Sequence, residues 1–384
     1  MTNQSKGPLA GIRVLDLTTM ISGPMATMML AEQGADVIKV EAPGTGDLIR
    51  YIGCSAGGIS AIFATLNRGK RSVALDLKSE EGRRDLLRLA ATADVFVQNS
   101  RPGVVERMGL GEDEIRQVAP DIIYVSINGF GESGPYSQWR VYDVVIQALS
   151  GMAASQSNPK TGDPELVRNV VCDKITSLYA AQAITAALLA RERGGDPSHV
   201  RLSMLDAAIA FLWPDVMQAE TLVGDDVTRP APLSEILSVA ETRDGHVALI
   251  AVSDAEFAGL CRAMDMPELI DDPRFIDLPA RAENAREVVS IVKDHARTRT
   301  TDEFCKQLHE FEVPAAHIVT VNQVVSDPQV SANKTVCMTE HPAAGPVRTP
   351  RGPARFGRPS ADAGPAPLLG QHTEEVLAGL AKEK

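Results

Sequence analysis

Five apolar runs that alternate with helical stretches constrain the fold of this chain most strongly. The runs at 12–19, 35–41, 71–77, 94–99 and 121–128 are rich in Val, Ile and Leu, as strands buried on both faces are. Helical sequences separate several of them, at 24–33, 80–93 and 103–117. Strand, helix, strand in this rhythm predicts an α/β fold, with a mostly parallel sheet covered by helices on both faces.

The most strongly helical sequence lies at 174–193, where Ala and Leu dominate until Gly194 and Gly195 end the pattern. Asp173 stands directly before it, a position that favours a helix N-cap. A carboxylate there also stays ionised, because the helix dipole favours an anion, and nearby N–H groups can stabilise an oxyanion. Asp173 is therefore a candidate nucleophile as well as a candidate cap, and its spacing alone favours the cap.

The rest of the chain indicates a second domain. A further helix is expected at about 202–218, and turn formers then cluster at 224–236. A strand is expected at 245–252, and the pairs Ser253/Glu256 and Thr300/Glu303 have the spacing of capping boxes. The segment 341–368 is predicted to be an extended connection before a closing helix at 372–384, which His372 begins. We expect a large domain from 1–224 and 326–384, and a small α+β domain at 225–325.

The sequence GFGESG at 129–134 follows a predicted strand and matches the dinucleotide pattern GxGxxG. That pattern requires a helix to open within it, whereas Pro135 and a run without helical period follow here. We therefore predict a flexible loop at the carboxyl edge of the sheet rather than a nicotinamide or flavin site. Tyr142 and Asp143, just beyond it, are expected to be buried hydrogen-bonding residues, and Cys172 is expected to serve packing.

Charge and cysteine usage exclude several classes of protein. The net charge of -12 makes the chain a poor general binder of nucleic acid or anionic membrane. The five cysteines are scattered, and no His or Cys spacing predicts a metal site, which suits a reducing cytoplasm. We recognise no signal peptide and no membrane-spanning run. Basic residues beside predicted loops and strand ends could together hold phosphates: Arg50, Lys70, Arg71, Lys78, Arg101, Arg107 and Arg140.

Several blocks together resemble one family. They are GIRVLDLTTMISGPMATMMLAEQGADVIKVEAPGTGD, NRGKRSVALDLKSEEG, NSRPGVVERMGL, GFGESGPYSQWRVYDVVIQALSGM and PLLGQHTEEVL, spread over about 8–215 and 320–378. In combination they resemble the family III CoA-transferases, the group of formyl-CoA transferase and carnitine CoA-transferase. The resemblance implies a Rossmann-like large domain built from both chain ends, a small domain between them, and two chains interlocked as a homodimer.

The resemblance also implies roles for individual residues. Asp173 matches the catalytic aspartate that precedes the Ala-rich helix, and Tyr142, Gly129 and Gly131 are expected to complete the catalytic site. The substrates would be an acyl-CoA and a carboxylic acid, with no tightly bound cofactor and no metal. Contacts to CoA are expected from Thr19, Met20, Ile21, Ser22, Leu75, Lys78, Asn99, Ser100, Arg107 and Arg140.

The expected reaction is transfer of CoA through an aspartyl anhydride and an aspartyl-CoA thioester. The family also contains α-methylacyl-CoA racemases, but these carry a catalytic histidine where this chain has Tyr142. A racemase and an idle CoA-binding protein remain the alternatives. Two positions depart from the pattern: Ala42 stands where many members have Arg or Lys near the adenine, and 225–260 lacks the glycine-rich loop of formyl-CoA transferase.

Overall fold

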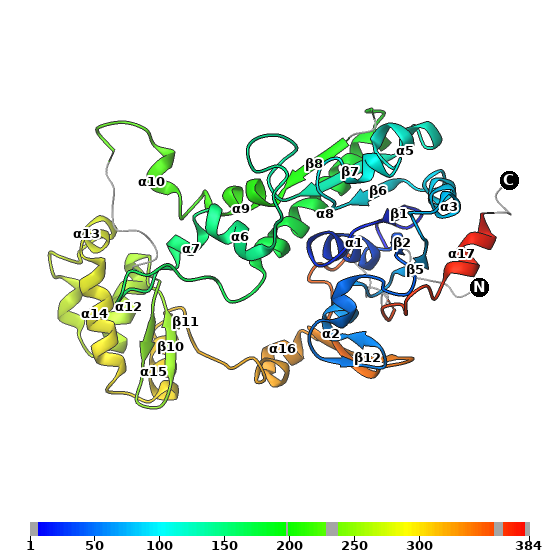
Figure 1. Ribbon diagram of the computed structural model, residues 1–384. Helices are drawn as coiled ribbons and strands as arrows, with labels where there is room; N and C mark the ends of the chain where they lie inside the picture. The colour runs from blue at the N-terminus through cyan, green and yellow to red at the C-terminus, as the bar shows by residue number, and fades with distance from the viewer. Residues whose placement is uncertain (1–6, 197–198, 228–236, 357–363, 381–384) are drawn as a thin grey trace. The chain divides into compact units, whose positions relative to one another are not determined.

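The computed structural model describes residues 7–196, 199–227, 237–356 and 364–380 of the 384-residue chain (Figure 1). The chain divides into two compact units. The first joins Met1–Phe211 to Ser331–Lys384, and the second comprises Leu212–Val330. Both ends of the chain thus belong to one unit. None of the described helices is both long and apolar enough to span a bilayer.

A six-stranded sheet forms the centre of the first unit. Its strands are β1 (Arg13–Asp16), β2 (Asp36–Glu41), β5 (Arg71–Ala74), β6 (Val95–Gln98), β7 (Ile123–Asn128) and β8 (His199–Ser203). They lie in the order β5-β2-β1-β6-β7-β8, and every neighbouring pair is parallel. The predicted parallel sheet is therefore confirmed. Strand β8 was not expected, and it pairs with β7 from Tyr124 to Asn128.

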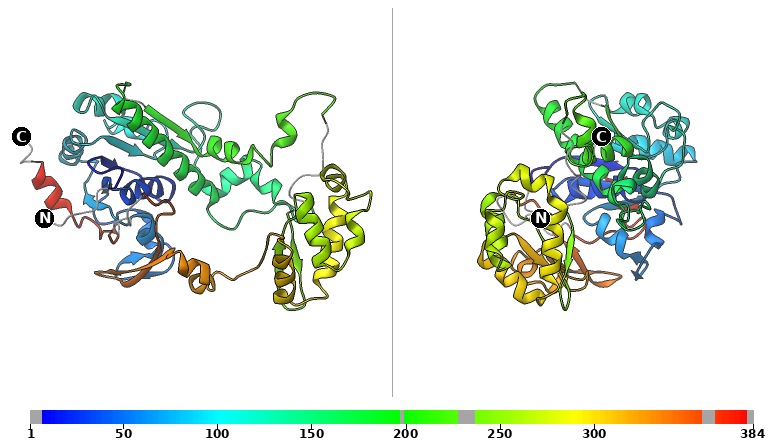
Figure 2. Two further views of the ribbon diagram at one scale, coloured as in Figure 1. Left: turned by 180° about the vertical axis from the view of Figure 1, so that it is seen from behind. Right: turned by 90° about the vertical axis from the view of Figure 1, so that its left-hand side faces the viewer.

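Helices cover both faces of this sheet, as the alternating side chains of its strands require. On one face, α1 (Ser22–Glu32) and α8 (Val171–Glu192) pack on Val14, Val37 and Val125. On the other, α3 (Glu80–Ala90), α5 (Glu112–Val118) and α17 (Thr373–Gly379) pack on Leu15, Ile38 and Phe96. Figure 2 shows the first unit from behind, with the long green helix α8 running along the sheet.

Three predicted segments differ from the structure. The helix predicted at 103–117 is two helices, α4 (Val104–Arg107) and α5, because Gly109 adopts a φ of 70° between them. The helix predicted at 202–218 ends early, as α9 (Met204–Leu212). The extended connection predicted at 341–368 is wrong at its start, where β12 (Val336–His341) and β13 (Gly345–Pro350) form an antiparallel hairpin.

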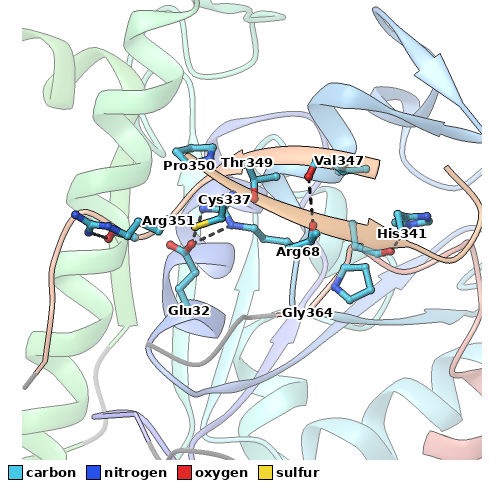
Figure 3. Close-up of a pocket in the computed structure, with 14 residues that line it drawn as sticks. Glu32, Arg68, Cys337, His341, Val347, Thr349, Pro350, Arg351 and Gly364 are labelled. Atoms are coloured by element: carbon cyan, nitrogen blue, oxygen red, sulfur yellow. Dashed lines mark hydrogen bonds and ion pairs between the residues drawn. The ribbon is translucent and has the colours of Figure 1, made fainter. Parts of the chain in front are cut away.

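The hairpin β12–β13 closes a small pocket over an ion pair between Arg68 and Glu32, whose Nη2 and Oε1 atoms lie 2.5 Å apart (Figure 3). Its volume is about 40 Å³, enough for a few water molecules. Cys337 and His341 also line it, but none of the predicted site residues does. The pocket therefore lies between the hairpin and α1, and it is separate from the candidate site.

The C-terminal segment covers the edge of β5. His372 Nδ1 accepts the Ser72 N–H at 3.2 Å, and the His372 N–H donates to the Ser72 carbonyl at 2.9 Å. Thr373 Oγ1 accepts the Ala74 N–H at 3.0 Å. The backbone groups of this edge strand, which would otherwise be open to pairing with another chain, are thus satisfied within the molecule.

The second unit is a small α+β structure. Its antiparallel sheet has the order β11-β10-β9, from Ala315–His317, His246–Leu249 and Val239–Glu241. Helices α12 (Asp254–Ala263), α14 (Ala285–Ala296) and α15 (Thr301–Glu310) share one apolar core with it. The capping boxes at Ser253 and Thr300 are both confirmed.

Shorter elements complete the two units. They are η1 (Leu48–Tyr51), β3 (Ser55–Ala56), β4 (Ile59–Ser60), α2 (Ala61–Leu66), α6 (Asp143–Leu149), α7 (Met152–Ser155), α10 (Gln218–Thr221), η2 (Pro267–Ile270), α13 (Leu278–Glu283), η3 (Val324–Ser326) and α16 (Pro328–Ala332).

Two buried ion pairs involve residues in or beside strands β1, β2 and β5. Lys70 Nζ is 2.9 Å from Asp16 Oδ2, and Lys39 Nζ is 3.0 Å from Asp47 Oδ2, with all four side chains fully buried. Burial would raise the pKa of Asp16, but the charges of Lys70 and Lys39 outweigh it and hold that pKa well below its usual range. The Asp16 carboxylate therefore stays ionised beside the two lysines.

These pairs correct part of the phosphate prediction. Arg50 is buried against Glu41, with Nη2 2.6 Å from Oε2, and Lys70 is committed to Asp16. Arg71 pairs with Asp36. Because a buried cation beside a carboxylate has already exchanged its water for that partner, Arg50 and Lys70 are not free to hold a phosphate, whereas the Arg71–Asp36 pair is partly exposed.

We predict that Lys70→Met lowers the free energy of unfolding by about 3–5 kcal/mol, because it strands the buried Asp16 carboxylate. Arg88→Ala, which breaks a partly exposed pair with Asp85 in the same unit, should lower it by about 1 kcal/mol or less. Urea unfolding of both variants at neutral pH measures the difference. Equal losses would show that the buried pair contributes no more than the exposed one.

Candidate active site

Most of the residues that we predicted to contact the coenzyme follow strands that end at one edge of the parallel sheet. Because the strands are parallel, the segments that follow β1, β5, β6 and β7 all leave from the same edge. Thr19, after β1, and Asn99, after β6, bond reciprocally: the Thr19 N–H donates to Asn99 Oδ1 at 2.9 Å, and Asn99 Nδ2 donates to the Thr19 carbonyl at 2.8 Å. The structure therefore joins two of the loops that the sequence analysis assigned to one site.

Buried charges fix the turn between β1 and α1. Met20 has a φ of 68°, which is unfavourable for a side chain of this size. Its N–H donates to Asp47 Oδ1 at 3.0 Å, and Lys39 Nζ donates to the Thr18 carbonyl at 2.7 Å. Strain of about 1–3 kcal/mol persists only where the surroundings hold the backbone, as these groups do. The turn delivers Ser22 to the start of α1.

Asp173 lies inside helix α8 rather than before it. The helix begins at Val171 with Val170 as its N-cap, so Asp173 is the third helical residue, and the predicted N-cap role is wrong. The physical reason is that the cap comes from another element. The Asp173 N–H, an orphan donor of the first turn, donates to Asp143 Oδ2 at 3.0 Å. The Asp173 carboxylate is thus left free of capping.

Asp143 is the first residue of α6 and is buried, as predicted. Its other oxygen accepts Gln147 Nε2 at 2.6 Å, and Gln147 Oε1 accepts the Val167 N–H at 2.9 Å. Asp143 and Gln147 therefore tie α6 to the segment that leads into α8. This network sets where the first turn of α8 begins, and with it the position of Asp173.

The environment of Asp173 raises its pKa to about 6. Burial is the largest cause, and the neighbouring Asp143 carboxylate adds to it. The hydroxyl and backbone N–H of Ser22 donate to the Asp173 carboxylate and oppose the rise. The half-buried carboxyl group is therefore still ionised at neutral pH, and it is more basic than an exposed aspartate.

Residues beside Asp173 differ in their accessibility. Cys172 is fully buried, and burial raises the pKa of its thiol to about 12, so it serves packing as predicted. Tyr142 is 64% exposed, which corrects its predicted burial. It precedes α6 on an extended backbone and is open to a ligand.

The glycine loop contains no helix, in agreement with the prediction for 129–134. Gly131 has a φ of 93°, and its N–H donates to Asn128 Oδ1 at 2.6 Å. A Cβ at Gly129 would lie 2.7 Å from Val141 Cγ1, so close packing requires glycine there. The Gly131 N–H is therefore occupied in this conformation.

The remaining predicted coenzyme residues are held less tightly. Leu75 is buried, and Ser100 is anchored by its N–H to Gln98 Oε1 at 2.8 Å. Lys78, Arg107 and Arg140 are exposed. Ala42 is also exposed, after β2 on the same edge. Arg101 donates to the Gln138 carbonyl at 3.3 Å. Four of the predicted cations are thus exposed, Lys78, Arg101, Arg107 and Arg140, and Arg107 is the last residue of α4. In the described parts of the chain, no cluster of three or more His, Cys, Asp or Glu residues is arranged to bind a metal ion.

Comparison with known proteins assigns the chain to a family. The model of CoA-transferase family III matches residues 9–373. The chain belongs to this family. As a family III CoA-transferase it is an enzyme, and the resemblance that the sequence blocks indicated is confirmed.

Curated relatives of this family III CoA-transferase are similar along most of its length. The human succinyl-CoA:glutarate CoA-transferase is 35% identical and covers 96% of this chain and 85% of its own. The succinate–glutarate CoA-transferase of Agrobacterium fabrum is 35% identical, with 98% and 96% covered. A crystal structure of a CAIB/BAIF family protein from Brucella suis has a TM-score of 0.81 at 30% identity, covering 98% of this chain and all of that one.

Sequence reasoning named Asp173 and the loops of this transferase but missed what holds them. Asp143 was noted only as a buried polar residue, and Gln147 and Ser177 were not singled out. Ser177 Oγ donates to the Ser22 carbonyl at 2.7 Å, across 155 residues of sequence. The one signal in the sequence was that Ser177 is a polar residue on the buried side of a largely apolar helix, where a hydroxyl needs a hydrogen-bond partner.

We predict that Asp173→Asn stabilises the protein at alkaline pH. The folded pKa of about 6 exceeds the unfolded value, so the unfolded state loses its proton first and stability falls as pH rises from about 4 to 6. Without that charge, the variant should gain about 1–3 kcal/mol over wild type at pH 8 and nearly nothing at pH 4.

Urea unfolding at the two pH values measures this gain. Asp113→Asn, at an exposed acid in the first turn of α5, is the control and should change stability by about 0.5 kcal/mol or less at both. A gain for Asp173→Asn that is equal at pH 4 and pH 8 would contradict the raised pKa.

Proposed function

We propose that this enzyme moves CoA from an acyl-CoA thioester to a carboxylic acid, with the Asp173 carboxylate as the covalent carrier. The observation that carries the proposal is the setting of Asp173 within a family III chain. Its own N–H is capped by Asp143, so its carboxylate is left to react. A carboxylate with a raised pKa is both ionised near neutral pH and a stronger nucleophile than an ordinary aspartate.

The proposed reaction has four displacements. Asp173 attacks the thioester carbonyl, a C–O bond forms, the C–S bond breaks, and CoA leaves as thiolate. The thiolate then attacks the carbonyl of Asp173 in the mixed anhydride and releases the donor acid as carboxylate. The acceptor carboxylate attacks the aspartyl-CoA thioester carbonyl, the C–S bond breaks, and CoA leaves again as thiolate. The thiolate finally attacks the acceptor's carbonyl carbon in the new anhydride, which forms the new acyl-CoA and frees Asp173 as carboxylate. Each step exchanges one acyl bond for another, so the energy of the thioester is kept.

The coenzyme is proposed to lie along the carboxyl edge of the sheet. The turn Thr19–Ser22, the segment with Leu75 and Lys78, and the Asn99–Ser100 loop border this edge. Lys78, Arg107 and Arg140 are exposed cations that suit the phosphates of CoA. The proposed catalytic roles of Tyr142, Gly129 and Gly131 rest on their position beside Asp143 and at the end of β7.

A dicarboxylic acid is the acceptor that we propose to test first. The names of similar proteins pair succinyl-CoA with glutarate, and formyl-CoA or acetyl-CoA with oxalate. The chain lacks the glycine-rich loop expected for formyl-CoA transferase, which favours succinyl-CoA and glutarate over formyl-CoA and oxalate.

The assembly is proposed to be an interlocked homodimer. Val223 and Val321 in the second unit are 96% and 90% exposed in the single chain. The proposal rests on the family resemblance, and these two valines are apolar groups of the second unit that a second chain would cover. Light scattering should give twice the chain mass of 41.0 kDa. A mass of one chain at micromolar concentration would contradict the proposal.

We predict a donor-dependent covalent adduct at Asp173. Incubation with succinyl-CoA alone, followed by hydroxylamine, should convert Asp173 to its hydroxamate, because both the anhydride and the thioester react with that nucleophile. Peptide mass spectrometry locates the label. Asp173→Ala should give no label and reduce transfer to glutarate by at least about 10⁴-fold, as expected for loss of a covalent carrier. Undiminished transfer by Asp173→Ala would overturn the mechanism.

We predict that kcat/KM for succinyl-CoA falls on the acid side with an apparent pKa near 6. Protonation removes the attacking carboxylate, and its pKa of about 6 places the change within the working range. Initial rates with succinyl-CoA and glutarate between pH 4.5 and pH 8 measure this fall in rate on the acid side. A rate that stays constant down to pH 4.5 would contradict ionised Asp173 as the nucleophile.

A further inference from the structure

We propose that Ser22 is a catalytic residue, whose hydroxyl and backbone N–H hold the negative oxygen that forms when the carbonyl carbon of Asp173 is itself attacked. The inference rests on the proposed function, and it goes beyond the contact with CoA that we proposed for Ser22. It assigns Ser22 to the acyl carrier, where it stabilises charge on the enzyme side of the reaction.

The chemistry requires such a group. Asp173 is the nucleophile in the first displacement, but it becomes the electrophile in the second and third. The CoA thiolate attacks Asp173 Cγ in the anhydride, and the acceptor carboxylate attacks the same carbon in the thioester. Each attack moves an electron pair onto the carbonyl oxygen of Asp173, and each collapse returns it as the leaving group departs. Donors that face this oxygen lower both barriers.

Ser22 is placed to donate. It is the first residue of α1, where the N–H groups have no partner within the helix. Its hydroxyl and N–H both face the Asp173 carboxylate and hold the pKa of that group below the value that burial alone would give, while Ser177 Oγ bonds to the backbone carbonyls of both residues. The positive end of the α1 dipole points the same way. Asp173 Oδ atoms and a developing oxyanion occupy nearly the same place, because they belong to the same carbon.

The surroundings hold Ser22 in this place. Ser177 Oγ is 2.7 Å from the Ser22 carbonyl and 2.8 Å from the Asp173 carbonyl, so one hydroxyl joins both backbones. Two residues before Ser22, the Met20 N–H is fixed to Asp47, and Lys39 neutralises Asp47. Ser22 is only 4% exposed, and little reorganisation is left for it when charge develops.

Neighbouring donors are already engaged. The N–H of Asp173 donates to Asp143, and the N–H of Gly131 donates to Asn128. Among the groups described at this site, Ser22 supplies the hydrogen bonds that reach the Asp173 carboxylate. The oxyanion role therefore falls to Ser22 in this conformation.

The test is Ser22→Ala, which removes the hydroxyl and leaves the backbone N–H. With succinyl-CoA alone, we expect the aspartyl-CoA thioester to form about 10²-fold more slowly in the variant than in wild type. Intact-protein mass spectrometry of a quenched time course measures this rate. In the free enzyme, carbon-13 NMR of the labelled Asp173 carboxyl should show a higher pKa in the variant, since a donor to the charged form is lost. This second measurement does not depend on turnover.

Thr176→Val is the matched control. Thr176 lies on the same helix, is fully buried, and its hydroxyl donates to the Cys172 carbonyl at 2.7 Å rather than to Asp173. The control should change neither the adduct rate nor the pKa of Asp173. If Ser22→Ala forms the adduct at the wild-type rate, or slows it without raising that pKa, the role of Ser22 is overturned. If wild type forms no adduct although its Asp173 pKa responds to Ser22→Ala, the proposed transfer mechanism fails, and the catalytic role falls with it.

Discussion

The pair of Lys39 with Asp47 is the interaction on which the geometry of the site depends. Both charges are fully buried, and taking them from water costs several kcal/mol each, so they persist only with partners. Those partners are backbone groups of the turn after β1: Lys39 binds the Thr18 carbonyl and Asp47 binds the Met20 N–H. An apolar core would pack as well but would not dictate where these peptide groups lie. The buried charges thus specify one conformation of the turn.

The sheet was predictable because its signal is local and repeated. Buried parallel strands are apolar on both faces, and β1, β2, β6 and β7 all show this in consecutive residues. Strand β8 was not predicted because its sequence HVRLS is short and polar, and it forms a strand because it pairs with β7. The hairpin β12–β13 escaped for a similar reason, since Pro and Gly suggested a connection while its stability comes from packing over Arg68 and α2.

The candidate site was predictable in its residues but not in its support. Asp173 could be named from its place before an Ala-rich segment and from the family blocks around it. Its true position in the helix could not, because the N–H that defines the first turn is satisfied by Asp143, thirty residues earlier. Arg50 and Lys70 were misjudged for the same reason: a lone sequence shows a cation, and only the fold reveals whether a carboxylate lies beside it.

The tail that covers β5 also sets an order of assembly. The second unit, Leu212–Val330, is one continuous segment, so all of it has been synthesised before the segment that completes the first unit. His372 and Thr373, which satisfy the edge of β5, follow the whole of the second unit in the chain and so leave the ribosome after it. Until then a newly made chain carries an unpaired strand edge, the kind of surface on which nascent proteins associate wrongly. A chain cut short before residue 372 would keep that edge open permanently, so His372 and Thr373 protect the sheet from pairing with another chain.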